Sequence, residues 1–217
     1  MAALAHQFEE GGPGMYPILL WQIIAIGVIV ERAIYLYKCS INRDVFLATM
    51  QKCILAGDVG RAIKLCSAAN APLARIVKSG LMKVNRPDTE VQAAMDEQAL
   101  KELPLIEHRT PYLALLANLA MLSGLLGTVW GLIVAFGAVA NADAASKATM
   151  LAKGISEAMN CTAFGLFAAI IALLGFAVLN GKTQTLLDDI NSATVQVVNL
   201  VVNNRSRINL EGVEAAA

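Results

Sequence analysis

Charged and aromatic side chains are scarce in this sequence. Of its 217 residues only 16% are charged and 6% are aromatic, whereas 57% are apolar. Soluble domains average about 25% charged residues. The composition therefore excludes an intrinsically disordered chain, a secreted disulfide scaffold and an ordinary soluble enzyme domain. The 17 basic and 17 acidic residues cancel, so no excess of positive charge indicates a nucleic-acid partner.

Histidines and paired cysteines are also few, which argues against a bound metal or haem. The candidates are His6, His108, Cys39, Cys53, Cys66 and Cys161, and no CxxC pair occurs among them. This spacing is not that of a zinc site. We interpret the cysteines as small apolar residues within helices. Glycine-rich phosphate loops in a strand-to-helix context and HExxH motifs are absent too. We therefore expect no metal, no cofactor and no enzymatic activity.

Three long apolar segments are present instead. The first runs from about Tyr16 to Tyr37, the second is uncharged from 110 to 142, and the third, 154–181, contains one charge, Glu157. About 20 helical residues cross a hydrocarbon core of ~30 Å. No Lys or Arg precedes Arg32, so the first segment lacks the basic start of a cleaved signal peptide. The sequence predicts an all-α membrane protein with three transmembrane helices.

The distribution of Lys and Arg predicts how the chain is oriented. Residues 1–31 contain none, whereas residues 38–110 contain eleven. Because basic residues gather on the cytoplasmic side, we expect the N-terminus outside and 38–110 in the cytoplasm. The predicted segments are an outer N-terminal segment (1–14), transmembrane helices (15–37, 111–140 and 153–180), a helical cytoplasmic region (38–110), a short outer loop (141–152) and a cytoplasmic tail (181–217).

Apolar residues at helical spacing predict short helices within 38–110, over 44–56, 59–69 and 72–84. Thr89 and Gln92 have the spacing of a capping box, which predicts a further helix running toward the second apolar segment. Pro104 and Pro111 are expected to kink or interrupt it. At the inner end of the first segment, Glu31 and Arg32 are interpreted as an adjacent charge pair.

Glu157 is the outstanding candidate for a functional residue. A carboxylate facing lipid costs several kcal/mol, so such a residue commonly marks an aqueous path, a partner charge or a proton relay. The alternative is that Glu157 lies at headgroup level and only marks the start of the helix. Asn160 and Cys161 share its helix face, which adds a polar patch.

Small and hydroxyl-bearing residues distinguish the second and third segments. Gly124, Gly127 and Gly131, with Gly165 in the third segment, allow helices to approach closely. Thr128 and Thr162 have two interpretations. Their hydroxyls could line an ion path, or they could bond back to carbonyls of their own helix and have no further role.

These residues resemble the motifs of a known family. Gly124-Leu-Leu-Gly-Thr-Val-Trp-Gly131, followed by Ala135-Phe136, resembles the second-span motif of the MotA/TolQ/ExbB proton-channel family. Gly154-Ile-Ser-Glu-Ala158, followed by Thr162-Ala-Phe-Gly165, resembles its third-span motif. The three-span layout is similar to the TolQ/ExbB branch rather than to the four-span flagellar branch.

The resemblance implies a stator subunit of the bacterial inner membrane, surrounded by lipid and with its outer side in the periplasm. Such subunits form rings, usually homopentamers, around a dimer of a single-span ExbD/TolR-like protein that carries the proton-binding aspartate. Proton flow then drives mechanical work on an envelope, transport or motility machine. By motif position Glu157, Thr128 and Thr162 would line the ion pathway, and Gly124, Gly127, Gly131 and Gly165 would pack helices around the pore. The carboxylate of Glu157 favours H⁺ as the transported ion, and the sequence leaves Na⁺ open as the alternative.

The chain departs from the family pattern at three positions. Met121, Lys153 and Ile171 stand where prolines are common in the family, and losing these prolines would straighten the helices. Two other functions stay open: a membrane scaffold of the same fold that conducts nothing, and a small solute transporter that works without a partner. The sequence does not indicate which machine is driven.

Overall fold

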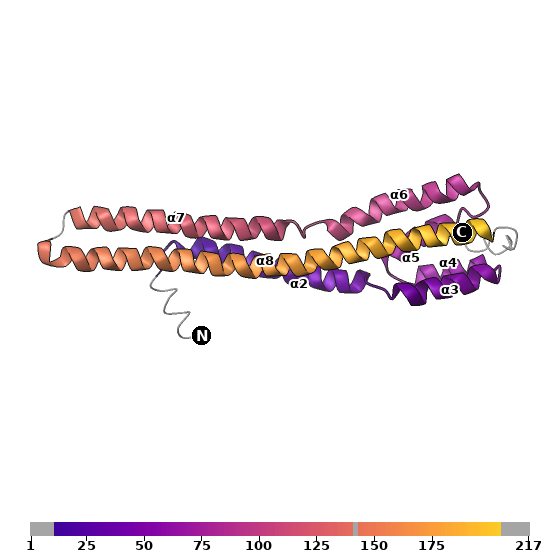
Figure 1. Ribbon diagram of the computed structural model, residues 1–217, viewed down its shortest axis with the longest axis horizontal. Coiled ribbons are helices and arrows are strands. Elements are labelled where there is room, and N and C mark those ends of the chain that lie inside the picture. Colours follow the sequence, from indigo (N-terminus) through magenta and orange to yellow (C-terminus); the bar gives the residue numbers. More distant parts are fainter. Residues whose placement is uncertain (1–10, 141–142, 205–217) are drawn as a thin grey trace. The chain divides into compact units, whose positions relative to one another are not determined.

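The computed structural model describes residues 11–140 and 143–204, and every regular element in this part of the chain is an α-helix (Figure 1). The all-α prediction is therefore confirmed. The helices are α2 (Met15–Cys39), α3 (Arg43–Leu55), α4 (Val59–Ala68), α5 (Pro72–Leu81), α6 (Asp88–Glu107), α7 (Tyr112–Ala140) and α8 (Ala144–Asn203). The predicted segments 1–14, 141–152 and 181–217 lie partly outside the described residues.

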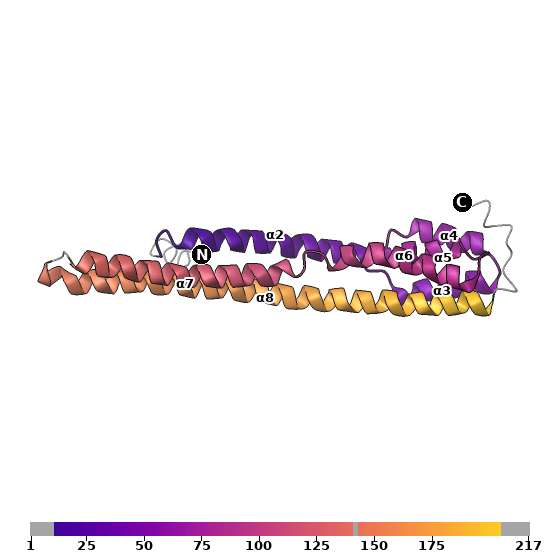
Figure 2. The same ribbon diagram turned by 90° about the horizontal axis from the view of Figure 1, so that it is seen from above.

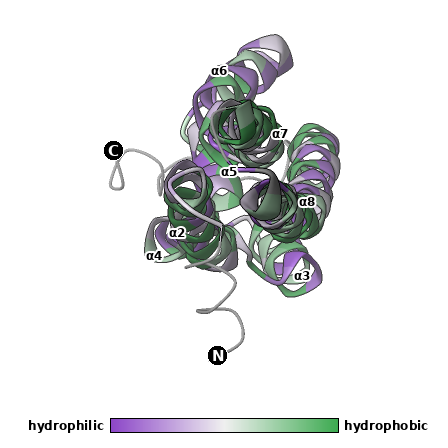
Figure 3. Ribbon diagram, turned by 90° about the vertical axis from the view of Figure 1, so that its left-hand side faces the viewer, coloured by the Kyte–Doolittle hydropathy of each residue, from purple (hydrophilic) through white to green (hydrophobic). Residues whose placement is uncertain are grey.

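Three stretches of helix are long and apolar enough to cross a membrane, Met15–Leu55, Asp88–Ala140 and Ala145–Asn203. In Figure 3 the ribbon of α7 is coloured mostly as hydrophobic, whereas that of α6 alternates with hydrophilic stretches. The structure thus confirms three helical stretches long and apolar enough to be membrane spans, in the number predicted for a membrane protein. The exact limits of the spans stay predictions.

Helix α8 extends beyond the predicted third span at both of its ends. It begins at Ala144, so most of the expected loop 141–152 is helical, and it continues to Asn203 within the expected tail. The reason is local: good helix formers such as Ala occupy its first turns, and no proline follows. Helices α7 and α8 also continue unbroken through Met121, Lys153 and Ile171, as expected without the family's prolines.

The structure divides into two compact units, and each is described by itself. One comprises residues 1–32 and 109–180, and the other comprises residues 33–108 and 181–217, within the described parts of these ranges. In the first unit α7 and the adjoining part of α8 lie side by side (Figures 1 and 2). The N-terminal part of α2 packs on them through a core of Ile18, Ala120 and Ala168.

Helix α2 is also fixed to α7 by a polar contact. Nε1–H of Trp21 donates a hydrogen bond to Oγ of Ser123, over 3.2 Å. At the other end of this unit, Oε1 of Glu31 lies 3.0 Å from Nη1 of Arg109, and Arg32 is only 4% exposed. The sequence analysis interpreted Glu31 and Arg32 as an adjacent charge pair, and the partner that the structure gives Glu31 is a residue distant in the sequence.

The break between α6 and α7 falls at residues 108–111. Pro104 lies inside α6 and does not end it, whereas Pro111 immediately precedes α7. Arg109 adopts φ 72°, a left-handed conformation that is uncommon for any residue but glycine. The expected interruption therefore occurs at Pro111 and not at Pro104.

The second unit stacks its short helices in chain order, α3 against α4, α4 against α5, and α5 against α6. Side chains cap two of them: Asn42 Oδ1 accepts from the Val45 N–H over 3.3 Å, and Asp58 Oδ1 accepts from the Arg61 N–H over 2.9 Å. The capping box predicted at Thr89 does not form, because the N-cap of α6 is Pro87, two residues earlier, and no side chain caps the helix.

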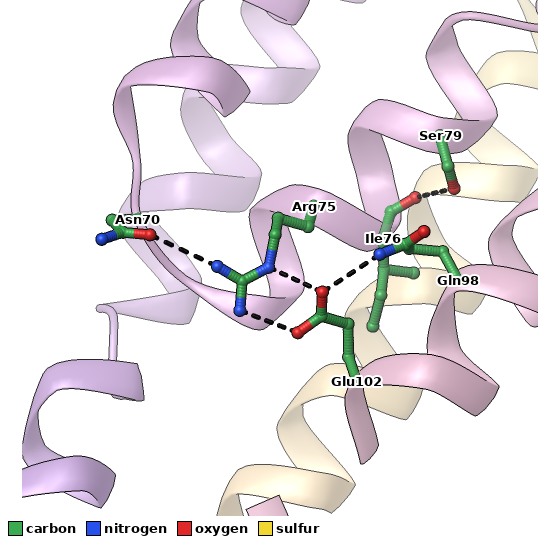
Figure 4. Close-up of polar contacts among 6 residues, drawn as sticks. All are labelled: Asn70, Arg75, Ile76, Ser79, Gln98 and Glu102. Atoms are coloured by element: carbon green, nitrogen blue, oxygen red, sulfur yellow. Dashed lines mark hydrogen bonds and ion pairs between the residues drawn. The ribbon is translucent and has the colours of Figure 1, made fainter. Parts of the chain in front are cut away.

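Two polar clusters hold this unit together. Arg75 donates from Nε and Nη2 to the two carboxylate oxygens of Glu102, both over 2.7 Å, and Gln98 and Asn70 complete the cluster (Figure 4). Separately, Arg43 bonds to Asp189 and Ser192 on α8, over 3.2 and 2.7 Å. These clusters fix α5 to α6 and α3 to α8.

Candidate functional site

Glu157 lies on the part of α8 that belongs to the first unit, and it is half-buried. A pocket of about 420 Å³ opens beside it. Trp130 and the glycines Gly127 and Gly131 of α7 line the pocket, together with Cys161 of α8. The carboxylate therefore does not simply face outward from an isolated helix. It borders a cavity whose other walls are mostly apolar.

The glycines predicted from the sequence lie where α7 meets α8. A Cβ placed on Gly124 would be 3.1 Å from the Cα of Gly165, and one on Gly165 would be 2.9 Å from the Cα of Gly124. A Cβ on Gly127 would be 3.0 Å from that of Cys161, and one on Gly131 would be 3.2 Å from that of Ala158. Each distance is tighter than ordinary van der Waals contact, so any side chain here would push the helices apart.

The two threonines differ from each other in their hydrogen bonding. Oγ1 of Thr128 donates to the carbonyl of Leu125 over 2.6 Å, which is the back-bonded alternative that the sequence left open. Oγ1 of Thr162 is buried and has no hydrogen-bond partner within the described part of the chain. An unsatisfied buried hydroxyl is rare and calls for an explanation.

Within one chain, the structure brings only some of the predicted site residues together. Glu157, Gly127 and Gly131 line the same pocket, whereas Thr128 and Thr162 are not part of its lining. Gly124 and Gly165 form the neighbouring helix contact.

The sequence interpretation missed the N-terminal stretch Gly11–Gly14 as part of this site. Gly11, Pro13 and Gly14 line the pocket beside Glu157, and Sγ of Cys161 donates a hydrogen bond to the carbonyl of Gly11 over 3.0 Å. The available signal was the composition itself: three glycines in four residues permit backbone approaches that other residues do not.

The cysteines lie in helices, all four are buried, and no disulfide joins them. Burial raises the pKa of the Cys66 thiol in the second unit from 9.0 to about 12, so this thiol is neutral at physiological pH. In the part of the chain that the structure describes, no three His, Cys, Asp or Glu side chains lie close enough together to hold a metal ion.

Comparison with known proteins gives consistent matches. Residues 68–192 match the family model of the MotA/TolQ/ExbB proton channel family. The chain is 30% identical over 165 residues to the putative biopolymer transport protein ExbB-like 3 of Synechocystis sp., covering 76% of this chain and 79% of that protein. It is 37% identical over 116 residues to the Tol-Pal system protein TolQ of Haemophilus influenzae, covering 51% of this chain and 50% of TolQ.

Similarity to a third relative extends over most of both chains. The biopolymer transport protein ExbB of Neisseria meningitidis serogroup A is 29% identical over 203 residues, which cover 85% of this chain and 90% of that protein. All seven predicted site residues, from Gly124 to Gly165, fall inside the stretch that the family model matches.

Proposed function

This chain belongs to the MotA/TolQ/ExbB proton channel family, and from that premise we propose that it is an energising subunit of the ExbB/TolQ type. In this proposal the subunit conducts protons along a path that includes Glu157 and passes the resulting work to an envelope, transport or motility machine. Relatives named for biopolymer transport and for the Tol-Pal system support this class of function.

The position of Glu157 is the observation that carries the proposal. It is the one charged residue in the apolar stretch 154–181, and it borders a pocket between α7 and α8. Keeping a carboxylate in such a place is costly unless it serves an ion or a partner charge. A carboxylate binds and releases protons readily, so H⁺ is the proposed ion.

The proposed assembly is a ring, a homopentamer, around a dimer of a single-span ExbD/TolR-like protein. The three predicted transmembrane segments contain no Asp, so a proton-binding aspartate would have to come from that partner. In the ring, Thr128 and Thr162 would face the ion path, and the unsatisfied hydroxyl of Thr162 would meet water or a partner group there.

The proposed location is the bacterial inner membrane, with the N-terminus in the periplasm. Eleven Lys and Arg residues within 38–110, against none within 1–31, support this orientation. In the same arrangement α3 to α6 lie in the cytoplasm, and α8 carries the chain from the periplasmic face into the cytoplasmic region.

The test is proton flux into proteoliposomes that contain the protein co-purified with its single-span partner. Glu157→Gln should abolish flux, because the amide can neither carry a charge nor exchange the proton. Glu90→Gln makes the same chemical change at an exposed carboxylate on α6 and should conduct normally. Full flux through Glu157→Gln would refute the proposal.

The alternatives predict different results in the same preparation. A scaffold of this fold would show no flux in any variant, and a solute transporter would be active without a partner. Native mass spectrometry in mild detergent tests the assembly. A five-copy ring that takes up two partner chains supports the proposal, whereas a monomer that ignores the partner contradicts it.

A further inference from the structure

The four residues Gly11–Gly14, called the glycine strap below, lie across the candidate site and have no role in the function proposed above. The strap precedes α2 and forms its first turn, since the N–H groups of Met15 and Tyr16 donate to the carbonyls of Gly12 and Pro13 over 3.3 and 3.4 Å. Its position is therefore fixed by the helix that follows it.

The backbone of the strap contacts α7 and α8 at two residues, Gly11 and Gly14. The Gly11 carbonyl accepts a hydrogen bond from the thiol of Cys161, which is 2% exposed. A Cβ on Gly14 would lie 3.0 Å from Sγ of Cys161 and 3.4 Å from the Cα of Gly127. The strap thus lies directly on the close contact between the two helices, about one turn from Glu157 along α8.

Gly12 is the point at which the strap meets the carboxylate. It has φ 65°, where a side chain is strained, and a Cβ there would overlap Oε1 of Glu157. The positive φ favours glycine at this position, and a side chain on residue 12 would displace the flexible end of the Glu157 side chain. Gly27 on α2 is different, because a Cβ there would meet nothing within 4 Å.

We propose that Gly12 is a positioning residue: the glycine strap, held by Cys161 and Gly127, confines the side chain of Glu157 to the pocket between α7 and α8. This inference rests on the proposed function of Glu157, and it adds the residues that set where the carboxylate points. Without the strap, the Glu157 side chain is free to adopt other rotamers, and its acid group is open to reagents on that side.

The first test measures how fast a carbodiimide modifies Glu157 in the full-length protein with its partner, at fixed pH, by mass spectrometry of the peptide. Gly12→Ala disfavours the backbone conformation in which the strap lies on α7 and α8. We therefore expect the carbodiimide to modify Glu157 faster, by roughly fivefold or more. Gly27→Ala is the matched control and should react like the wild type. Equal rates in Gly12→Ala and wild type would overturn the proposal.

A second variant covers the case in which Gly12→Ala fails to fold. The distance from a Cβ at Gly14 to Sγ of Cys161 suits a disulfide, so Gly14→Cys should cross-link to Cys161 on oxidation. In the disulfide-linked form the strap is held in place, so modification of Glu157 should be slower than in the reduced form. The double variant Gly14→Cys with Cys161→Ser cannot form this disulfide and should show no such redox dependence. Absence of the cross-link, or equal rates in both redox states, would contradict the proposal.

These measurements separate the inference from the function on which it rests. Modification of Glu157 is a chemical readout that requires no proton flow. If Glu157→Gln conducts normally, the proposed function fails even though the strap still controls access to the carboxylate. If Glu157→Gln abolishes flux but the strap variants react like the wild type, the function stands and the positioning role is wrong.

Discussion

Nη1 of Arg109 lies 3.0 Å from Oε1 of Glu31, so an ion pair joins α2 to the residue that opens the turn before α7. The two residues are 78 positions apart in the sequence. Arg109 forms this pair from a left-handed backbone conformation, with φ 72°. The guanidinium therefore contributes favourably to stability, while the backbone of the same residue contributes unfavourably.

Two substitutions at Arg109 separate these contributions. Arg109→Ala and Arg109→Gly remove the same ion pair, which is exposed and contributes only about 0.2–1 kcal/mol. Glycine also relieves the positive φ, whereas alanine does not. We expect Arg109→Gly to be about 1 kcal/mol more stable than Arg109→Ala, as measured by unfolding in detergent. Equal stability of the two variants would show that the turn relaxes around residue 109.

The pair of Arg75 and Glu102 predicts an asymmetric response. The Glu102 side chain is 8% exposed and that of Arg75 is 40% exposed, and the hydrogen bonds that Arg75 donates to Glu102 raise the pKa of Arg75. Arg75→Ala leaves a nearly buried carboxylate with little compensation and should cost about 2–3 kcal/mol. Glu102→Gln should cost less, because the Arg75 guanidinium reaches water.

The control for this comparison is the ion pair of Lys101 with Glu97, four residues apart on α6 and exposed on both sides. Lys101→Ala removes a hydrogen bond that lowers the pKa of Glu97, yet it should leave the unfolding transition almost unchanged. If Lys101→Ala and Arg75→Ala proved equally damaging, burial of Glu102 would not be the cause of the asymmetry.

Sequence patterns predicted the helical class, the number of membrane-crossing stretches and the glycines at the α7–α8 contact, because each depends on local periodicity or side-chain size. They did not reveal contacts between distant residues. Sequence analysis related Glu31 to its neighbour Arg32, and the structure also gives Glu31 an ion pair with Arg109. Gly12 contacts Glu157, and no local pattern connects two residues so far apart. Helix α8 also begins at Ala144 and ends at Asn203, beyond the predicted third span at both ends.

Cys66 predicts a dependence of stability on alkaline pH. Its thiol has a pKa of about 12 when folded, against 9.0 ordinarily, because burial disfavours the thiolate. The unfolded chain therefore loses this proton first, and stability falls as pH rises between about 9 and 12. Cys66→Ala should remove that part of the decline in denaturation curves measured across this range.

The same burial should make Cys66 unreactive. At pH 8 we expect alkylation by iodoacetamide to be far slower in the folded protein than in denaturant, because the thiolate is the nucleophile. Mass spectrometry of the Cys66 peptide reports the extent of labelling. Rapid labelling of the folded chain would contradict both the burial and the raised pKa.

Replacing Thr128 or Thr162 by valine tests whether these hydroxyls line the proposed ion path. The two substitutions are expected to change the stability of the protein differently. Thr128→Val removes a hydroxyl that already donates to Leu125, so stability should change little. Thr162→Val removes a buried hydroxyl without a partner in the described chain, which should stabilise the isolated subunit by about 1 kcal/mol. We expect both variants to assemble into rings.

For Thr162→Val we expect proton flux to fall although the stability of the isolated subunit rises. If Thr162 provides its hydroxyl to water or a partner in the assembled channel, Thr162→Val should reduce proton flux more than Thr128→Val, even though it is the more stable protein. A stability gain combined with a flux loss identifies a group retained for function rather than for folding. Normal flux in both variants would eliminate the threonines from the proposed ion path and leave Glu157 as the one residue of this chain that the proposal assigns to it.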